Sequence, residues 1–329
     1  MTTQTDARPA ATATVISRLG TDVAGLLPLV VAVVALFALG AVTTAGFAAP
    51  ENIRAVLIAA SITGIVAVSM TFLTLSGNYV SLGVQQSTVL AALLFLHTVA
   101  EGHGVTLAIL VSVLAVVAVG VAQGIVVALG MNTIITTLAT GSVLFGITAS
   151  ASGSGVVTAE GKSIGWLDAS LVFGLPIAVY GFVAVTILAT LISARTVIGR
   201  KVLLAGANRR TARLNGISAT ATTLFGFVAL SLGAAIAGVL TAAQLGQATA
   251  SDMPSLTIDV VAAVLVGGTA IAGGYGSPIR SALGAITIAL LNNVMVLNNF
   301  ATGWRFAIQG LVVVGVVCLL QYLARKRAN

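Results

Sequence analysis

The stretch VLVGGTAIAGGYGSP, residues 264–278, is apolar at its start and carries five glycines between Gly267 and Gly276. Glycine is a poor helix former, because its backbone loses more conformational freedom on folding than that of any other residue. Inside a membrane, glycine permits close packing of helices, or it marks a helix broken at a depth where its backbone lines a polar path. Both interpretations stay open at this point.

The residues on either side of this stretch belong to a chain with the composition of a multi-pass membrane protein. Of its 329 residues, 58% are hydrophobic and 7% charged, and the mean hydropathy is +1.12, whereas soluble domains carry about 25% charged residues. Isolated strands leave backbone groups unpaired in lipid, and the apolar runs lack the alternation of a barrel, so we predict an all-α polytopic fold. We expect about ten transmembrane helices, at 24–46, 53–75, 79–98, 105–129, 133–150, 171–193, 219–243, 259–275, 279–297 and 305–323.

A second weak helix begins with SGNYVSLGVQQS, residues 76–87, at a roughly corresponding place in the first half of the chain. Broken segments in both halves indicate a transporter with inverted repeats and a substrate route between them. We therefore predict broken or re-entrant glycine-rich segments and an inverted repeat, although no repeat of individual residues is evident. The residues expected along the substrate path are Asn78, Tyr79, Ser81, Gln85, Gln86, Asp259, Gly268, Thr269, Gly273 and Gly274.

Several of these polar residues also have a purely structural explanation. An acid within the membrane is costly and tends to mark function, but Asp259 is also close enough to the predicted outer boundary to be solvated. Gln85 and Gln86 are equally suited to hold helices together, because amides in hydrocarbon need partners. We expect the end of the 279–297 helix to be capped by Asn292, Asn293, Asn298 and Asn299.

Lysine and arginine are unevenly distributed between the two predicted sides of the membrane. With the N-terminus in the cytoplasm, twelve basic residues lie inside and three, Arg54, Lys162 and Arg305, lie outside, which favours two cytoplasmic termini. Because this orientation explains the net charge of +7, we exclude nucleic acid as a partner. The predicted organisation is a cytoplasmic tail at 1–22, a transmembrane domain at 23–324 with a cytoplasmic loop at 194–218, and a basic tail at 325–329.

The segment GSGVVTAEGKS, residues 153–163, has glycines and a Gly-Lys-Ser but lacks the spacing of a phosphate-binding loop. Five residues separate Gly155 from Gly161, whereas the motif requires four. The segment is also predicted on the outer side, away from cytoplasmic nucleotide, so Lys162 is not an ATP ligand. If ATP powers this protein, another chain must bind it.

Catalytic and metal-binding residues are sparse. His97 and His103 flank Glu101 in one outer loop, and two histidines with one carboxylate are weak evidence for a metal site. Because both histidines lie in that loop, no Ser/His/Asp or Cys/His constellation is credible. The single cysteine, Cys318, forms no internal disulfide. We expect a chain that is no enzyme by itself and that binds no cofactor and no metal.

Two segments carry a resemblance to a known family. LLAGANRRTARLNGI, residues 203–217, has a glycine turn, an asparagine, a short helix ending in Arg-Leu, and then Gly-Ile; residues 258–293 have an Asp-containing helix, two glycine motifs and a helix ending in Asn-Asn. Together with the ten-span layout, they resemble the permeases of ribose-type ABC transporters, in the monosaccharide and branched-chain amino acid permease family. The matching positions are Gly206, Asn208, Arg213, Leu214, Gly216, Ile217, Asp259, Gly267, Gly268, Thr269, Ala272, Gly273, Gly274, Gly276, Asn292 and Asn293.

This resemblance implies a permease subunit of an ATP-binding-cassette importer in the bacterial plasma (inner) membrane, moving a monosaccharide or a similar hydroxylated small solute. The implied partners are a second permease copy, identical or similar, two cytoplasmic ABC ATPase subunits that bind ATP and Mg²⁺, and an extracytoplasmic solute-binding protein. The alternatives are an ABC permease for nucleosides or branched-chain amino acids, and an ion-coupled secondary transporter. The residues implied to couple to the ATPase are Gly206, Asn208, Arg209, Arg213, Leu214, Gly216 and Ile217.

Two positions depart from the pattern of this family. Tyr79, in SGNYVSLG at residues 76–83, stands where sugar permeases usually have an aspartate, which leaves the substrate open. Arg209 follows the asparagine of the coupling segment, where the family often has a glutamate. We expect the partner ATPase to present a more acidic groove to this arginine.

Overall fold

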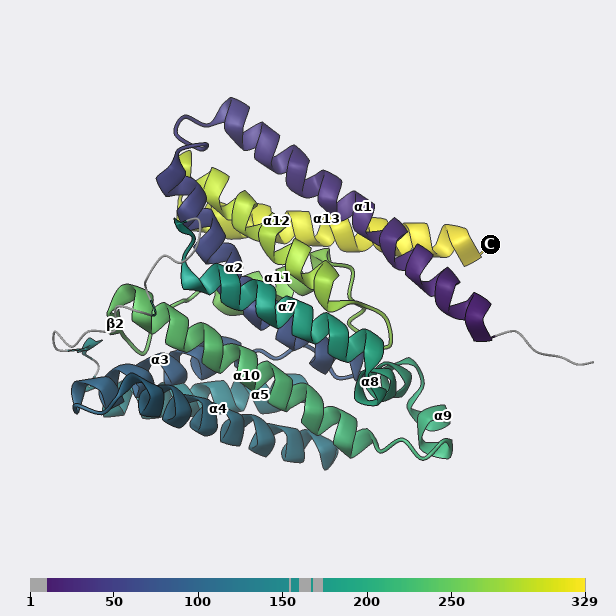
Figure 1. Cartoon of the computed structure of the whole chain (residues 1–329), viewed down its shortest axis with the longest axis horizontal. Helices are drawn as coiled ribbons and strands as arrows, with labels where there is room; N and C mark the ends of the chain where they lie inside the picture. The colour runs from purple at the N-terminus through teal and green to yellow at the C-terminus, as the bar shows by residue number, and fades with distance from the viewer. Residues whose placement is uncertain (1–10, 154, 160–166, 168–173, 329) are drawn as a thin grey trace, which may run out of the picture.

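The computed structural model describes residues 11–153, 155–159, 167 and 174–328, which form a bundle of long helices with their connections at two ends (Figure 1). A short antiparallel sheet at one end pairs β1 (Val157–Thr158) with β2 (Gln247–Ala248), with Val157 opposite Ala248. The helices are α1 (Ala11–Thr43), α2 (Pro50–Leu75), α3 (Val84–Ala100), α4 (Val105–Ala128), α5 (Thr133–Ala151), α7 (Ile177–Arg195), α8 (Val197–Ala207), α9 (Arg209–Leu214), α10 (Ala219–Leu245), α11 (Leu256–Val266), α12 (Pro278–Leu297) and α13 (Thr302–Ala328).

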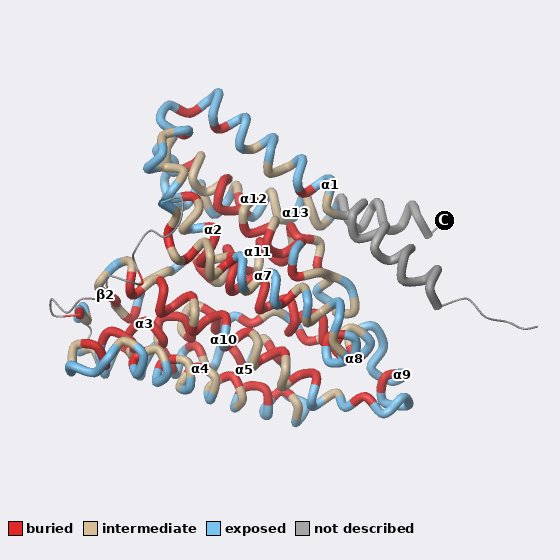
Figure 2. Tube along the Cα trace, viewed as in Figure 1, coloured by how far each residue is buried: buried red, intermediate tan, exposed pale blue. Residues whose placement is uncertain are grey.

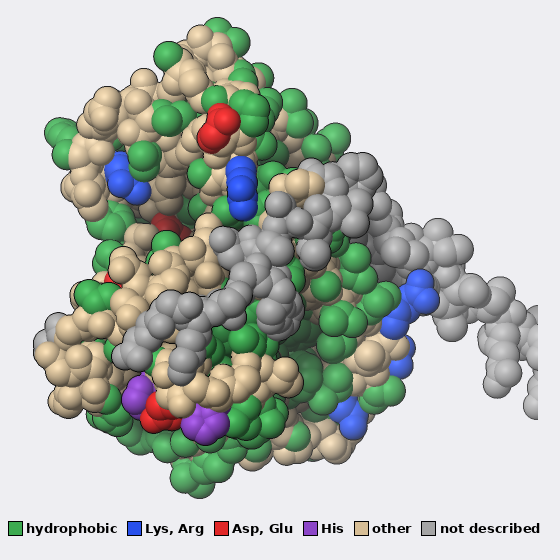
Figure 3. Space-filling view, turned by 60° about the vertical axis from the view of Figure 1, so that its left-hand side comes forward, with side chains coloured by type: hydrophobic (Ala, Val, Ile, Leu, Met, Phe, Trp, Pro, Cys, Tyr) green, Lys and Arg blue, Asp and Glu red, His purple; other side chains and the backbone are tan. Residues whose placement is uncertain are grey.

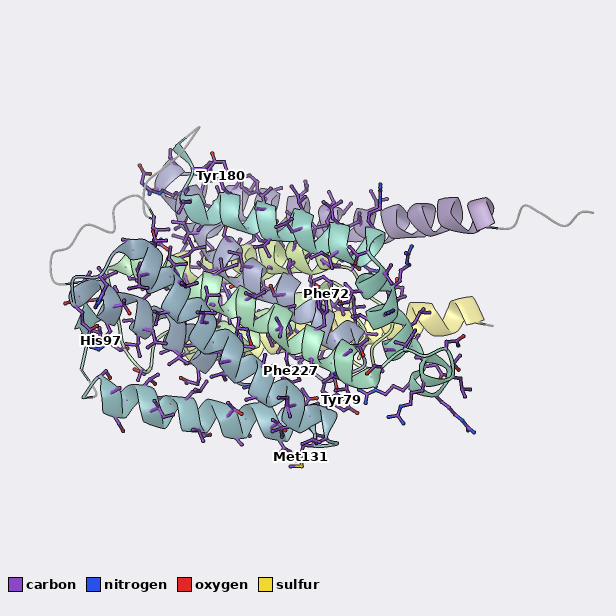
Figure 4. All side chains as sticks on the ribbon, turned by 60° about the horizontal axis from the view of Figure 1, so that its bottom comes forward. Phe72, Tyr79, His97, Met131, Tyr180 and Phe227 are labelled. Atoms are coloured by element: carbon purple, nitrogen blue, oxygen red, sulfur yellow. The ribbon has the colours of Figure 1, made fainter. Side chains whose placement is uncertain are left out.

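The two ends of the bundle differ in what they contain. At the end that we name the α9 end, α8 and α9 lie on the same side as the start of α1 and the end of α13 (Figure 1). At the opposite end, the β2 end, lie the short sheet and the loop that follows α3 (Figure 1). Figure 4 places His97 near the β2 end and Tyr79 and Met131 towards the α9 end.

The helix α2 forms the centre of the bundle, and every residue from Ile65 to Ser76 is buried. A helix that is apolar all round is normally buried, and α2 is packed against α7, α10, α11 and α12. The outer helices instead expose large apolar side chains such as Leu114 and Ile135, and Figure 2 shows the exposed residues along their outward faces. This distribution confirms the predicted all-α polytopic membrane fold.

The number of complete membrane spans is smaller than the number of apolar helices. Each of the ten predicted runs contains a helix, but among the described residues seven helices are long and apolar enough to cross a membrane, namely those within 26–43, 50–75, 105–128, 133–151, 177–195, 219–245 and 278–297. The apolar helices at 84–100, 256–266 and 302–318 are shorter. The count of ten spans therefore stays a prediction.

The two weak helices of the sequence are broken, as one of the two interpretations of their glycines predicts. The predicted helix 79–98 begins only at Val84, and the predicted helix 259–275 already ends at Val266, so both predicted boundaries are wrong. Each break begins with a glycine in the left-handed region, Gly77 at φ 79° and Gly268 at φ 73°, which side-chain-bearing residues rarely adopt. The inverted repeat stays a prediction.

The predicted cytoplasmic loop at 194–218 is a pair of helices, α8 and α9. Its sequence contains two side chains that cap helices: the Thr196 hydroxyl accepts a hydrogen bond from the Gly199 amide at 3.1 Å, and the Asn208 side chain accepts one from the Thr211 amide at 3.0 Å. Gly206, expected in a turn, lies in the last turn of α8. The predicted tail at 1–22 is helical from Ala11 on; Lys162 lies outside the described residues.

Glycine also permits the close packing of α11 against α12, the other interpretation of the sequence. A Cβ atom on Gly267 would lie 2.7 Å from the Arg280 carbonyl oxygen, and one on Gly284 would lie 2.1 Å from the Ala263 carbonyl oxygen. Both distances are too short for any real carbon–oxygen contact. The two backbones therefore approach each other to a distance that only glycine permits.

Substitution of Gly284 tests this packing. The added methyl group of Gly284→Ala faces backbone, which has no rotamer with which to move aside, so the variant should lose about 1–3 kcal/mol of stability. The expected result is a lower thermal unfolding midpoint of the detergent-purified protein. Gly310→Ala is the control, because a Cβ at that helical position would meet nothing within 4 Å. Equal midpoints for the two variants would contradict the packing described.

Candidate functional site

Three segments that are distant in sequence meet at the α9 end through their backbones. The amide of Gly274 donates a hydrogen bond to the carbonyl oxygen of Leu75 at 3.2 Å. A Cβ on Gly206 would lie 1.9 Å from that same oxygen, and a Cβ on Gly273 would lie 2.4 Å from the Cα of Gly77. We name these contacts the glycine junction; they join the end of α2, the end of α8 and the 267–277 turn.

Arg209 fastens α9 to the segment that precedes α3. Its guanidinium donates to the Gly77 carbonyl oxygen at 2.9 Å and to the Asn78 side-chain oxygen at 3.1 Å. The side-chain nitrogen of Asn78 donates in turn to the hydroxyl of Ser76 at 2.7 Å and to the hydroxyl of Thr223 of α10 at 3.1 Å. Arg209, predicted to couple, and Asn78, predicted along the path, are therefore in direct contact.

The remaining residues of the coupling segment give α9 a buried base and an exposed tip. Ile217 packs with Ala205 and Ala212 in a small apolar cluster. Gly216, at φ 71°, ends the helix by donating from its amide to the Arg213 carbonyl oxygen. Arg213 is exposed, and Leu214 is 83% exposed. Nitrogen-bearing side chains extend outward from this part of the molecule in Figure 4.

The segment from Asn78 to Gly83 has no helical structure, and it leads from the glycine junction into the bundle. Ser81 is buried, whereas Tyr79 is 49% exposed. Where α3 begins, the backbone amide of Gln85 donates a hydrogen bond to the Thr257 hydroxyl at 3.2 Å. The Gln85 side chain donates to the Asp252 carbonyl oxygen at 3.0 Å. Gln85 thus ties the start of α3 to the loop and helix that follow β2.

Two further residues predicted along the path, Gln86 and Thr269, lie in the interior in different ways. The side-chain oxygen of Gln86 is buried and has no hydrogen-bond partner among the described residues. Thr269 follows Gly268 in the broken segment and is buried, with its hydroxyl 3.3 Å from that of Ser281. Ser281 also accepts a hydrogen bond from Thr71 of α2 at 2.8 Å. Thr269 therefore belongs to a buried chain of hydroxyl groups.

Asp259 lies in the first turn of α11 and is 8% exposed, so the alternative that it is merely solvated is wrong. One of its carboxylate oxygens, Oδ1, accepts from Asn292 of α12 at 3.2 Å and from Gln309 of α13 at 2.9 Å. Gln309 is itself only 1% exposed. The acid predicted along the path is thus held by amides of two neighbouring helices.

Two of the four asparagines expected to cap the 279–297 helix do not cap it. Because α12 continues to Leu297, Asn292 and Asn293 lie within the helix and face other helices. Asn293 and Asn52 of α2 exchange two hydrogen bonds, at 2.8 and 3.0 Å. Asn298 is the C-cap residue, and its side chain donates to the Val294 carbonyl oxygen at 2.8 Å.

A cavity of about 250 Å³ lies among α2, α10 and the start of α11, and Asp259 lines it. Met253, in the loop before α11, adopts φ 55° and also lines the cavity. Figure 3 shows the β2 end with a recess that contains an acidic side chain. The polar residues around the cavity, besides Asp259, are Thr63, Thr241, Gln244 and Ser255.

The histidines at the β2 end lie close to one acidic neighbour. His97 and His103 lie 3.3 Å and 3.7 Å from different oxygens of Glu101, and all three side chains are exposed. Figure 3 shows histidine side chains beside an acid on this surface. Among the described residues, no group of three histidine, cysteine or acidic side chains is arranged to hold a metal ion.

Several residues of these sites were not expected from the sequence. Gln309 interrupts an otherwise apolar run, and that isolated amide was a usable signal. Thr223 gave no comparable signal, because threonine is common in membrane helices. Arg280 was counted only for orientation, yet it is buried, and its guanidinium donates to the Tyr275 hydroxyl at 2.9 Å.

The fold and these sites define a class of protein: a multi-pass membrane transport protein, with a cavity towards one end and a backbone junction at the other. The chain belongs to the family of branched-chain amino acid transport system permease components, whose family model matches residues 52–317. This membership confirms the resemblance seen in the sequence.

Curated relatives align along most of the chain. It is 29% identical over 302 residues to the ribose import permease protein of Haemophilus influenzae, covering 90% of this chain and 93% of that protein. It is 29% identical over 312 residues to the L-arabinose transport system permease protein of Escherichia coli, covering 89% of each. The ribose import permease protein of Bacillus subtilis is 27% identical over 276 residues, with 83% and 85% covered. No solved structure matches significantly.

Removal of the Arg209 side chain should loosen the segment before α3. Arg209→Ala removes the donor to Gly77 and Asn78 from an exposed position, so the bundle should stay folded while the amides of residues 77–82 exchange hydrogen faster. Hydrogen–deuterium exchange with mass spectrometry measures this change. Arg210→Ala removes an equal charge from the neighbouring exposed position and should leave exchange at 77–82 unchanged. Identical exchange in the two variants would refute a fastening role for Arg209.

Proposed function

We propose that this chain is the permease subunit of an ATP-binding-cassette importer in the bacterial plasma (inner) membrane. Its cargo is a monosaccharide or a similar hydroxylated small solute. The ribose and L-arabinose permeases to which the chain aligns over most of its length support this cargo. The observation that carries the proposal is the glycine junction, because it joins a small exposed helix to the broken segments of the bundle interior.

The α9 end faces the cytoplasm in this proposal, and both termini lie on that side. Six basic residues lie in or beside α8 and α9, between Arg195 and Arg213. The positive-inside rule favours the cytoplasmic side for such a cluster between membrane spans. The β2 end then faces outward, where an extracytoplasmic solute-binding protein delivers the cargo.

The partner at the α9 end is an ABC ATPase subunit, which binds the ATP and Mg²⁺, whereas this chain binds no cofactor. The exposed apolar tip of α9, Leu214, offers a contact that a groove in the ATPase buries. The exposed guanidinium groups around it suit an acidic rim on that groove. A second permease, identical or similar, carries the second α9 to the second ATPase.

Force applied to α9 reaches the interior through contacts already present. Arg209 holds Gly77 and Asn78, and Gly206 is pressed against the Leu75 carbonyl oxygen. A movement of the α8–α9 pair therefore displaces the end of α2 and the segment that leads to Gln85. Packed interfaces with two arrangements convert such small displacements into a change of accessibility.

The ion-coupled alternative has a single candidate acid within the bundle among the described residues. Broken-helix carriers pair their breaks with intramembrane acids and other ion ligands. Asp259 is the acid found within the bundle, and it lies in an ordinary helical turn with two amide donors on one oxygen. Branched-chain amino acids and nucleosides are alternative cargoes of the same machinery, and the transport experiment separates them.

Reconstituted transport tests the proposed function directly. Proteoliposomes with the chain, its ATPase subunits and its solute-binding protein should accumulate radiolabelled D-ribose, L-arabinose or D-xylose when ATP is present. Without the ATPase, a proton or sodium gradient should drive no uptake. Uptake driven by the gradient alone would refute the proposal, and uptake of leucine or a nucleoside in place of sugar would refute the cargo.

The variant Leu214→Ser tests whether the tip of α9 is the binding site for the ATPase. Loss of the exposed leucine should abolish co-purification of the ATPase and ATP-driven uptake, while the thermal midpoint of the permease alone stays unchanged. Leu129→Ser is a matched control, because Leu129 follows α4 and is 82% exposed. Normal assembly of Leu214→Ser with the ATPase, or an equal loss of assembly in both variants, would contradict this binding site.

A further inference from the structure

The carboxylate of Asp259 has one oxygen engaged with the protein and one available. Oδ1 accepts both hydrogen bonds, from Asn292 and Gln309. Among the described residues, no side chain or backbone group donates to Oδ2, and this oxygen is not among the buried atoms that lack a partner. Asp259 also lines the cavity among α2, α10 and α11. Its second oxygen is therefore accessible from the cavity.

Among the described residues, no basic side chain forms a salt bridge with this carboxylate. Within the part of the chain that the structure describes, the salt bridges are those of Glu101 with His97 and His103, and Asp259 forms none. An acid inside a membrane protein is costly unless donors satisfy it. The two amides donate to Oδ1, so a ligand with a hydrogen-bond donor can supply the partner that Oδ2 lacks.

The walls of the cavity favour one class of ligand. The polar residues on its wall besides Asp259 are Thr63 of α2, Thr241 and Gln244 of α10 and Ser255 beside α11, but most of the wall is apolar, and the Thr241 hydroxyl already donates to the Ala237 carbonyl oxygen at 2.8 Å. The volume of about 250 Å³ lies below the range of about 300–1,000 Å³ typical of sites for drug-sized ligands. A small solute that presents apolar C–H faces to the wall and a hydroxyl group to Asp259 matches the size and the mainly apolar lining of this cavity.

We propose that this cavity is a recognition site within the permease itself, in which Asp259 Oδ2 accepts a hydrogen bond from a hydroxyl of a monosaccharide. The proposal rests on the function proposed above. It gives the permease its own selection for hydroxylated solutes, in addition to that of the solute-binding protein.

Asn292 and Gln309 are positioning residues in this site. They hold Oδ1 from α12 and α13, so that Oδ2 is directed towards the cavity. Because Gln309 is almost completely buried, its amide has no competing access to bulk water. Any displacement of α12 or α13 relative to α11 changes the direction of the accepting oxygen.

The variant Asp259→Asn tests the site in the complete complex of permease, ATPase and solute-binding protein in proteoliposomes. The readout is the amount of D-ribose, L-arabinose or D-xylose moved per ATP hydrolysed, with the binding protein saturated by the same sugar. Loss of a charged acceptor should lower this ratio about tenfold or more, while the binding protein still stimulates ATP hydrolysis. Glu51→Gln is the control, because Glu51 is an exposed acid in the first turn of α2.

A second measurement does not depend on the stability of Asp259→Asn. With Cys318→Ala as background, Thr241→Cys places the single thiol in the cavity wall, and an excess of the sugar should protect it from a membrane-impermeant thiol reagent. Ile258→Cys places the thiol at an exposed position beside Asp259 and should show no protection.

The outcomes separate this site from the proposed function. If the wild-type complex moves sugar and Asp259→Asn retains the wild-type ratio, the recognition site is wrong and the proposed function stands. Failure of the sugar to protect Thr241→Cys has the same meaning. If the wild-type complex moves none of the three sugars, the proposed function fails and the site fails with it.

Discussion

Direct contact between three backbones is the constraint on which this structure depends. At the glycine junction, the Leu75 carbonyl oxygen accepts from the Gly274 amide, and the Cα of Gly206 lies so close that a single methyl group would overlap that oxygen. Backbone groups freed by a broken helix must find partners, because the membrane interior supplies none. The junction supplies a partner for Leu75 and also joins α8 to the core helix, so one arrangement stabilises the fold and, in the proposed function, couples α9 to the interior.

Sequence patterns predicted the helices and the breaks between them better than they predicted the contacts between these segments. Composition and apolar runs predicted the helical membrane fold, because burial in lipid constrains almost every residue of a span. The glycines marked both breaks, since few other residues adopt φ near 75°. The contact of Arg209 with Asn78 was not predictable, because 131 residues separate them and each belonged to a different motif.

The errors in the predicted elements have local physical causes. Hydropathy does not register helix ends, so α3 and α11 were predicted too long, and it does not register side-chain caps, so α8 was predicted as part of a loop. The short helix ending in Arg-Leu that the resemblance implied is α9. Asn292 was expected to cap a helix because asparagine commonly does so. Its role became visible only when α11 and α13 brought Asp259 and Gln309 beside it.

The segment from Asn78 to Gln85 gives the two sites a physical connection. At its start, Asn78 accepts from Arg209; at its end, Gln85 donates to the carbonyl oxygen of Asp252, in the loop that also places Met253 on the cavity wall. Residues 78–83 have no helical structure and α3 begins at Val84, so a short connection links the contact of Arg209 to the contact of Gln85. In the proposed function, this connection carries a displacement of α9 towards the cavity.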